Sequence, residues 1–297
     1  MADDPGLRAA YARCESLARE HYENFPVASV LLPKRMRPPI AAIYAFARTA
    51  DDIADEPGRE PDERLRLLDD YRARLHASVQ RAPARDPVFT ALRDTIARND
   101  LPVQLFDDLL SAFRQDVLVH RYERWDDVSD YCRRSANPVG RLVLRVAGVR
   151  DEAADLASDA VCTALQLANF WQDLGRDWRN GRLYVPAEEA RRHGAVERDL
   201  DRPVMTKEWT VVMRACVKRT RSLFEEGRPV AEAVRGRLRL ELRATWLGGV
   251  RILEKIDALG YDTLHHRPKL GAADAARIAA GVLLWRNGRS QRTARST

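Results

Sequence analysis

Helical periodicity runs along almost the whole of this 297-residue chain. Apolar residues recur at spacings of three and four, and no alternation of apolar and polar residues is long enough to predict a β-sheet. Several periodic segments begin at a proline, which the first turn of a helix tolerates because its amide groups lack partners within the helix. The pattern therefore predicts an all-α protein whose helices bury one apolar interior.

The expected helices are joined by short connections. We expect them at residues 7–22, 38–55, 61–82, 87–98, 102–122, 126–134, 138–147, 151–178, 186–193, 206–226, 230–259 and 272–287, with a break in the penultimate helix near Gly248-Gly249. No linker rich in glycine, proline or serine divides the chain, so we expect a single domain over 1–287. Residues 288–297 are small, polar and basic, and we expect this tail to be disordered.

Composition excludes several classes of protein. Hydrophobic residues make up 45% of the chain and charged residues 32%, which fits neither a disordered chain nor an integral membrane protein. The net charge is +6, but the basic residues are mostly arginines spread over nearly every segment. Nucleic-acid-binding proteins gather such residues into a patch, so we expect no nucleic-acid partner. Attraction to an anionic membrane surface or a diphosphate substrate fits the charge better.

The ends of the chain and its cysteines indicate where the protein works. The four cysteines are widely separated and lack metal-ligand spacing, as expected of buried thiols in a reducing compartment. The start, Met-Ala-Asp-Asp-Pro, has no apolar signal core, and the apolar run at 278–285 is too short to cross a bilayer. We therefore expect a cytoplasmic protein that at most rests on a membrane surface.

An acidic strip lies in the expected helix 151–178. Asn169, Asp173 and Asp177 are spaced by four and so share one helical face, where their oxygens form the kind of ligand set that Mg²⁺ prefers. The preceding residues are apolar, and burying carboxylates without cations is costly. The alternative interpretation is neutralisation by Arg176 and Arg179. We call these three residues the second acidic strip.

The first acidic strip lies at the end of the expected helix 38–55. Asp51 and Asp55 are again four apart, with Arg48 one turn earlier. The alternative interpretation is an exposed acidic helix end with an Arg48–Asp52 salt bridge. Two acidic strips on two helices together suggest a site where metal ions hold a diphosphate.

The two strips, with Tyr44 and Arg48 before the first and Arg182-Leu-Tyr184 after the second, resemble the squalene/phytoene synthase family. The resemblance extends from His21 to about Arg267. It implies a single-domain, all-α class I isoprenoid synthase bundle with a central active-site cavity, acting on an isoprenoid diphosphate.

The resemblance also implies a role for each member of the two strips. Asp51, Asp55, Asp173 and Asp177 would bind Mg²⁺, and Asn169 would support the second metal cluster. Clustered Mg²⁺ stabilises the charge that develops on a departing diphosphate, and an apolar pocket protects the carbocation that remains.

A further set of residues would act beside the metal. Arg48 would contact diphosphate oxygens, Tyr44 and Tyr131 would lie near the diphosphate, and Phe25 and Val139 would line the hydrocarbon channel. The catalytic set implied is Asp51, Asp55, Asp173, Asp177, Arg48 and Tyr131. The substrate-binding set implied is His21, Phe25, Tyr44, Arg48, Ser135, Asn137, Val139, Asn169, Gln172, Arg182 and Tyr184.

Three departures from the commonest family pattern resemble the bacterial hydroxysqualene synthase branch. Gln172 stands where phytoene synthases usually carry arginine, residues 135–140 are Ser-Ala-Asn-Pro-Val-Gly, and residues 21–29 are His-Tyr-Glu-Asn-Phe-Pro-Val-Ala-Ser. That branch converts presqualene diphosphate to hydroxysqualene for hopanoid synthesis. The resemblance implies coupling to a presqualene diphosphate synthase and to a flavin-dependent reductase.

Several questions stay open from sequence. No glycine-rich nucleotide fingerprint follows a strand, so we expect no nicotinamide cofactor. Candidates for orienting the capturing water are Asn137, Ser135, Tyr22, Asn24 and Gln172. The nearest alternative function is condensation of two allylic diphosphates to presqualene diphosphate or phytoene. More distant alternatives are an inactive helical partner protein and a basic adaptor for membranes or nucleic acids.

Overall fold

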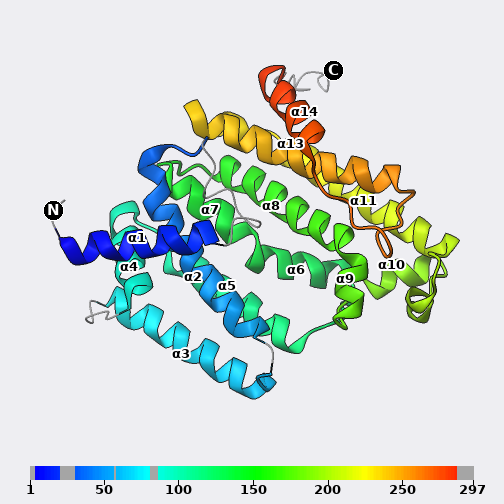
Figure 1. The fold of residues 1–297 in the computed structure, drawn as a ribbon, viewed down its shortest axis with the longest axis horizontal. Helices are drawn as coiled ribbons and strands as arrows, with labels where there is room; N and C mark the ends of the chain where they lie inside the picture. Colours follow the sequence, from blue (N-terminus) through cyan, green and yellow to red (C-terminus); the bar gives the residue numbers. More distant parts are fainter. Residues whose placement is uncertain (1–3, 21–30, 57, 81–85, 286–297) are drawn as a thin grey trace, which may run out of the picture.

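The computed structural model describes residues 4–20, 31–56, 58–80 and 86–285, and these contain helices and no strand (Figure 1). The helices are α1 (Pro5–Glu20), η2 (Lys34–Met36), α2 (Arg37–Asp55), α3 (Pro61–Val79), α4 (Pro87–Asn99), α5 (Val103–Leu118), α6 (Trp125–Ser135), α7 (Asn137–Val146), α8 (Glu152–Gln172), α9 (Leu174–Arg179), α10 (Ala187–Arg192), η3 (Glu197–Asp201), α11 (Lys207–Gly227), α12 (Val230–Ala233), α13 (Gly236–Ala258) and α14 (Ala272–Leu283). The all-α prediction is confirmed. The tail 288–297 lies outside the described residues, and no helix within them is both long and apolar enough to span a membrane.

Two central helices, α2 and α8, organise the bundle. Helix α8 packs against α6, α7, α11 and α13, while α2 packs against α1, α3, α4 and α5 (Figure 1). Buried aromatic side chains fill the interior, among them Phe46 on α2 and Trp171 on α8. The first acidic strip closes α2, and the second strip lies at the end of α8 and in α9. Burial of the apolar faces of α2 and α8 thus fixes where both strips lie.

The end of α8 differs from the expected continuous helix 151–178. The helix ends at Gln172, and α9 begins after a break at Asp173. The amide of Gly175 donates to the Thr263 carbonyl at 3.2 Å, and a Cβ at Gly175 would lie 1.9 Å from the Leu264 carbonyl oxygen. The chain at 263–264 therefore takes a hydrogen bond that would otherwise continue the helix. The spacing of the strip survives, because the Asp177 amide still donates to the Asp173 carbonyl at 2.8 Å.

Helix α5 is shorter than the expected 102–122. It ends at Leu118, and the next residues run extended beside 183–188. The Leu183 amide donates to the His120 carbonyl at 2.9 Å, and Arg121 and Leu183 form an isolated parallel bridge. This pairing positions Arg182 and Tyr184 on either side of Leu183.

The predicted break at Gly248-Gly249 is wrong. Helix α13 runs through both glycines, and the chain breaks earlier, at the extended residue Val234 between α12 and α13. A Cβ at Gly249 would lie 2.3 Å from Cζ of Phe224 and 2.9 Å from Cδ2 of Leu165. The glycine therefore serves close packing of α13 against α11 and α8 and does not interrupt the helix.

Substituting each glycine of this pair separates packing from helix propensity. Gly249→Ala should lower the free energy of unfolding by about 1–3 kcal/mol, because the new methyl group overlaps the Phe224 ring. Gly248→Ala is the matched control, since its Cβ would meet Leu270 Cδ1 at an ordinary 3.8 Å. This control should be neutral or stabilising by up to about 1 kcal/mol, as expected for a helix interior. Urea unfolding measures both, and equal effects would contradict the assignment.

Candidate active site

The first acidic strip lies at the C-terminal end of α2, where Arg48 forms a salt bridge with Asp51. Arg48 Nη1 lies 3.1 Å from Asp51 Oδ2, and the same guanidinium also contacts Asp52. Burial raises the pKa of Asp51 to about 6, and the charge of Asp55 raises it further. Tyr44, one turn before Arg48, is partly buried, which raises the pKa of its phenol. The Arg48–Asp52 salt bridge of the alternative interpretation is present, but it is shared with Asp51.

Arg182 connects the two acidic strips. Its Nη2 donates to Asp55 Oδ1 at 2.8 Å, while its backbone amide donates to the Asp177 carbonyl, also at 2.8 Å. The strips are therefore no farther apart than the length of one arginine residue. Arg182 thus joins the end of α2 to the end of α9, and the shared metal site of the two strips stays a prediction.

The second acidic strip takes its counter-charge from a distant part of the chain. Both nitrogens on one side of the Arg267 guanidinium contact Asp173, with Nη2 lying 3.1 Å from Oδ2. Burial raises the pKa of Asp177 to about 7, and the charge of Asp173 adds to this effect. The partner of Asp173 is thus Arg267, where the alternative interpretation had named Arg176 and Arg179. Asn169, one turn before Asp173, is exposed.

Gln172 fixes the segment that carries Arg267. Its side chain is buried, and Nε2 donates to the Pro268 carbonyl at 2.6 Å. A glutamine at this position therefore adds no charge beside Asp173 and instead anchors the residue next to Arg267. Sequence analysis placed Gln172 beside the site but did not predict this contact.

An aromatic cluster adjoins the strips. Phe170 and Tyr184 stack with ring centroids 3.7 Å apart, and Tyr131 lies within about 6 Å of both rings and of Tyr122. Tyr131 is buried, and its hydroxyl donates to Asp116 Oδ2 at 2.8 Å. Aromatic faces of this kind can stabilise a nearby cation.

Asp116 is a candidate site residue that the sequence motifs did not indicate. It lies on α5, in register with the buried Leu105, Leu109 and Ala112, so a carboxylate interrupts an apolar stripe. Burial raises its pKa to about 7, with the charges of Asp55 and Asp51 acting in the same direction. That interruption of the stripe was the available sequence signal.

The junction of α6 and α7 carries three of the remaining candidates. Asn137 is buried, and its Oδ1 accepts from Thr163 Oγ1 at 2.9 Å. Ser135 Oγ is a buried atom that finds no hydrogen-bond partner in the described part of the chain. Val139 is partly buried. Four candidates lie outside the described residues: His21, Tyr22, Asn24 and Phe25.

The carboxylates of the strips suit a divalent cation whose remaining coordination positions are filled by other ligands. Within the described ranges, no three His, Cys, Asp or Glu side chains converge as a ready-made metal site. One carboxyl group of each strip, Asp51 and Asp177, has a pKa raised by burial and by the charge of its neighbour in the strip, so a cation would relieve that repulsion. Mg²⁺ commonly binds through one or two carboxylates plus waters and substrate phosphates. The donor set therefore fits that ion.

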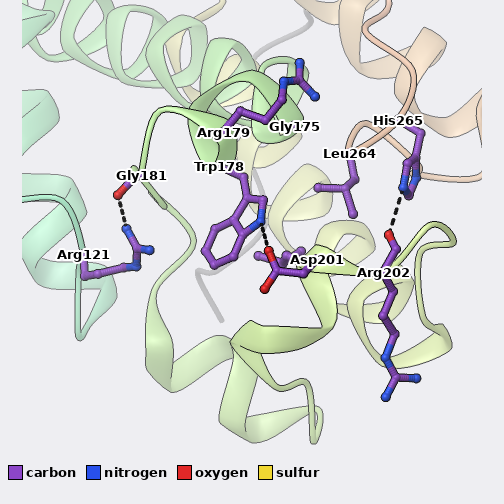
Figure 2. A pocket seen from close by; sticks show the side chains of 10 residues that line it. Arg121, Gly175, Trp178, Arg179, Gly181, Asp201, Arg202, Leu264 and His265 are labelled. Atoms are coloured by element: carbon purple, nitrogen blue, oxygen red, sulfur yellow. Dashed lines mark hydrogen bonds between the residues drawn. The ribbon is translucent and has the colours of Figure 1, made fainter.

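A separate pocket of about 550 Å³ lies behind α9 (Figure 2). Trp178 Nε1 donates to Asp201 Oδ1 at 2.9 Å, Arg121 contacts the Gly181 carbonyl, and the His265 ring lies beside the Arg202 carbonyl (Figure 2). These contacts tie α9, the loop after it and the segment before α14 to residues 121, 201 and 202. The pocket walls thus support the second strip.

The fold and the two acidic strips define an all-α isoprenoid synthase. The chain belongs to the squalene/phytoene synthase family, whose model matches residues 18–274. It is 40% identical over 217 residues to the hydroxysqualene synthase of Zymomonas mobilis, covering 71% of each chain. It is 39% identical over 251 residues to that of Rhodopseudomonas palustris, covering 83% of this chain and 84% of the relative.

Solved structures agree with this assignment. A squalene synthase, HpnC from Alicyclobacillus acidocaldarius, matches with a TM-score of 0.82 at 40% identity, covering 87% of this chain and 97% of that one. A dehydrosqualene synthase matches with a TM-score of 0.84 at 23% identity, which supports the fold alone. The predicted family, fold class and kind of enzyme are confirmed, with head-to-head isoprenoid synthase activity. The central cavity and the residue roles stay predictions.

The raised carboxyl pKa values predict a stability that falls with pH when divalent ions are absent. Asp51, Asp116 and Asp177 have folded pKa values of about 6 to 7, above the value of roughly 3.9 for an unfolded aspartate. Between these values the folded state binds more protons, so unfolding becomes easier as pH rises from 5 to 8. His120 acts oppositely, because burial lowers its pKa, but it is one group against three.

Thermal unfolding in a chelator at pH 5, 6, 7 and 8 measures this dependence. Asp177→Asn removes one titrating group and should flatten the fall. A variant whose pH dependence equals that of the wild type would contradict the role of Asp177.

The Gln172 hydrogen bond predicts local order in the segment that carries Arg267. Gln172→Ala leaves the buried Pro268 carbonyl without its donor and should cost about 1–3 kcal/mol of unfolding free energy. Amide hydrogen exchange across 263–270 should accelerate, as measured by mass spectrometry. Gln104→Ala is the matched control, because that side chain bonds only Asp108 on the surface. Unchanged exchange in Gln172→Ala would refute the anchoring role.

Proposed function

We propose that this enzyme ionises presqualene diphosphate and lets water capture the rearranged carbocation, giving hydroxysqualene and diphosphate. The observation that carries the proposal is the 39–40% identity to proteins named hydroxysqualene synthase over 71–83% of the chain. The neutral Gln172 supports the same branch. The product would feed hopanoid synthesis, with a presqualene diphosphate synthase before it and a flavin-dependent reductase after it.

The two strips supply the chemistry of ionisation. Asp51, Asp55, Asp173 and Asp177, with Asn169, would hold Mg²⁺, which when bound offsets negative charge on a departing diphosphate. The guanidinium groups that now pair with these carboxylates can then turn to diphosphate oxygens, for which arginine is well suited. They belong to Arg48, Arg182 and Arg267. Each arginine thus serves as a counter-ion before substrate binds and as a ligand afterwards.

The aromatic cluster would protect the cation. The faces of Phe170, Tyr184 and Tyr131 present π-electrons without a strong nucleophile, because burial raises the pKa of both tyrosines and keeps them neutral. Capture by water changes no oxidation state, so the proposed reaction consumes no nicotinamide cofactor.

Product analysis with separate substrates tests the proposal. Purified enzyme with Mg²⁺ and presqualene diphosphate should release one hydroxysqualene per diphosphate without any nicotinamide, as measured by mass spectrometry and a phosphate assay. Asp173→Asn should reduce turnover by about 10²–10³-fold, because it removes charge stabilisation in the transition state. Asp69→Asn is the control, an exposed aspartate on α3 that pairs with Arg114.

One result would refute the proposed reaction, and a second would refute the role of one residue. Consumption of farnesyl diphosphate with accumulation of presqualene diphosphate would establish the condensing alternative. Full turnover by Asp173→Asn would remove that residue from the metal site.

A further inference from the structure

Asp116 is a partly buried carboxyl group that lies beside the site and outside both acidic strips. It lies near the end of α5, and its Oδ2 accepts the Tyr131 hydroxyl at 2.8 Å. Ionisation as described above does not use this carboxyl. Burying a carboxyl next to other carboxylates is unfavourable, so its position calls for a functional explanation.

The contact fixes the orientation of the Tyr131 hydroxyl. Because its hydrogen points at Asp116, the phenol oxygen keeps its lone pairs for accepting a hydrogen bond from elsewhere. Packing against Tyr122, Phe170 and Tyr184 holds the Tyr131 ring in place. Tyr131 is thus an oriented hydrogen-bond acceptor within the aromatic cluster.

The charges around the pair favour a proton on Asp116 over a charge on Tyr131. Burial raises the pKa of Tyr131 well above its usual value, so the phenol does not ionise alone. Burial also raises the pKa of Asp116 to about 7; Tyr131 and Arg182 lower it, and Asp55 and Asp51 raise it. A carboxyl group with that balance can take up a proton near neutral pH.

We propose that Asp116 positions Tyr131 and receives, through it, the proton that water loses when it captures the carbocation. The inference rests on the proposed function and deepens it. An oxygen lone pair of water forms the new C–O bond to the cationic carbon, and one O–H bond of that water breaks. Its proton passes to Tyr131 Oη as the phenol proton passes to Asp116 Oδ2. Carbocation, water and carboxylate thereby become alcohol and carboxylic acid, with Tyr131 unchanged.

The test measures how much alcohol forms for each diphosphate released. Asp116→Asn keeps the shape and an oxygen that can accept the Tyr131 hydroxyl, but an amide cannot take the proton. Hydroxysqualene per diphosphate should fall at least fivefold from the wild-type ratio, with hydrocarbon elimination products making up the difference. The kcat for alcohol formation should fall at least tenfold, with KM changed by less than about threefold. A purely structural role would not shift the product ratio.

Further variants make the experiment specific. Tyr131→Phe should lower the same ratio, and the double variant should lose no more than the larger single effect, because the two residues act as one relay. Asp116→Glu restores a carboxylate and should recover part of the ratio. Asp107→Asn is the matched control: it lies on the same helix and pairs with Arg72 and His76, so it should change stability and leave the ratio alone.

The outcomes distinguish this inference from the proposed function. A wild-type enzyme that releases diphosphate from presqualene diphosphate without forming alcohol overturns both. A wild-type enzyme that forms alcohol, with an Asp116→Asn variant of unchanged product ratio, overturns the role of Asp116 alone. If Asp116→Asn does not fold, the Asp116→Glu and Tyr131→Phe ratios decide in its place, and two unchanged ratios refute the relay.

Discussion

Repulsion between carboxylates at the ends of two buried helices is the constraint on which this structure depends. Burial of α2 and α8 places Asp51 and Asp177 where ionisation is unfavourable, as their raised pKa values record. Arginines offset the charge, and two of them reach across the fold: Arg182 to Asp55 and Arg267 to Asp173. Because these carboxylates repel one another, bound cations would stabilise the site. Such a site is suited to bind a diphosphate together with metal ions.

The arginines are effective only because their backbones are held. Residues 120–123 pair with 183–188 and so fix Arg182, while the segment after α13 is held by the Gly175–Thr263 and Gln172–Pro268 hydrogen bonds. Helix α9 lies between these attachments: Gln172 precedes it at the end of α8, Gly175 is part of it, and residues 183–188 follow it. Its separation from α8 at Asp173 is therefore a consequence of building the site, and not a flaw in the helix.

Sequence periodicity predicted nearly all the helices, because each buries an apolar face whose spacing is local information. The helix ends were not predictable in the same way. Gly249 lies inside a helix, where its missing side chain leaves room for the Phe224 ring. Helix α8 ends next to Asp173, where the Gly175 amide donates to the Thr263 carbonyl instead of to its own helix. The site divides likewise. The strips are local patterns, whereas Asp116 and Arg267 gain their roles from partners 15 and 94 residues away in sequence. Spacing within one helix carries no record of such contacts.

The replacement of a customary arginine by Gln172 bears on which reaction the shared aspartates serve. An arginine there would add a further positive charge close in sequence to Asp173. With glutamine, Arg267 is the counter-ion of Asp173. The Gln172 side chain bonds the Pro268 carbonyl and so anchors the residue next to Arg267. With glutamine at this position, the site of the proposed reaction carries one positive charge fewer than it would with arginine. The proposed capture by water also requires a group that removes a proton, which is the role we infer for the Asp116–Tyr131 pair.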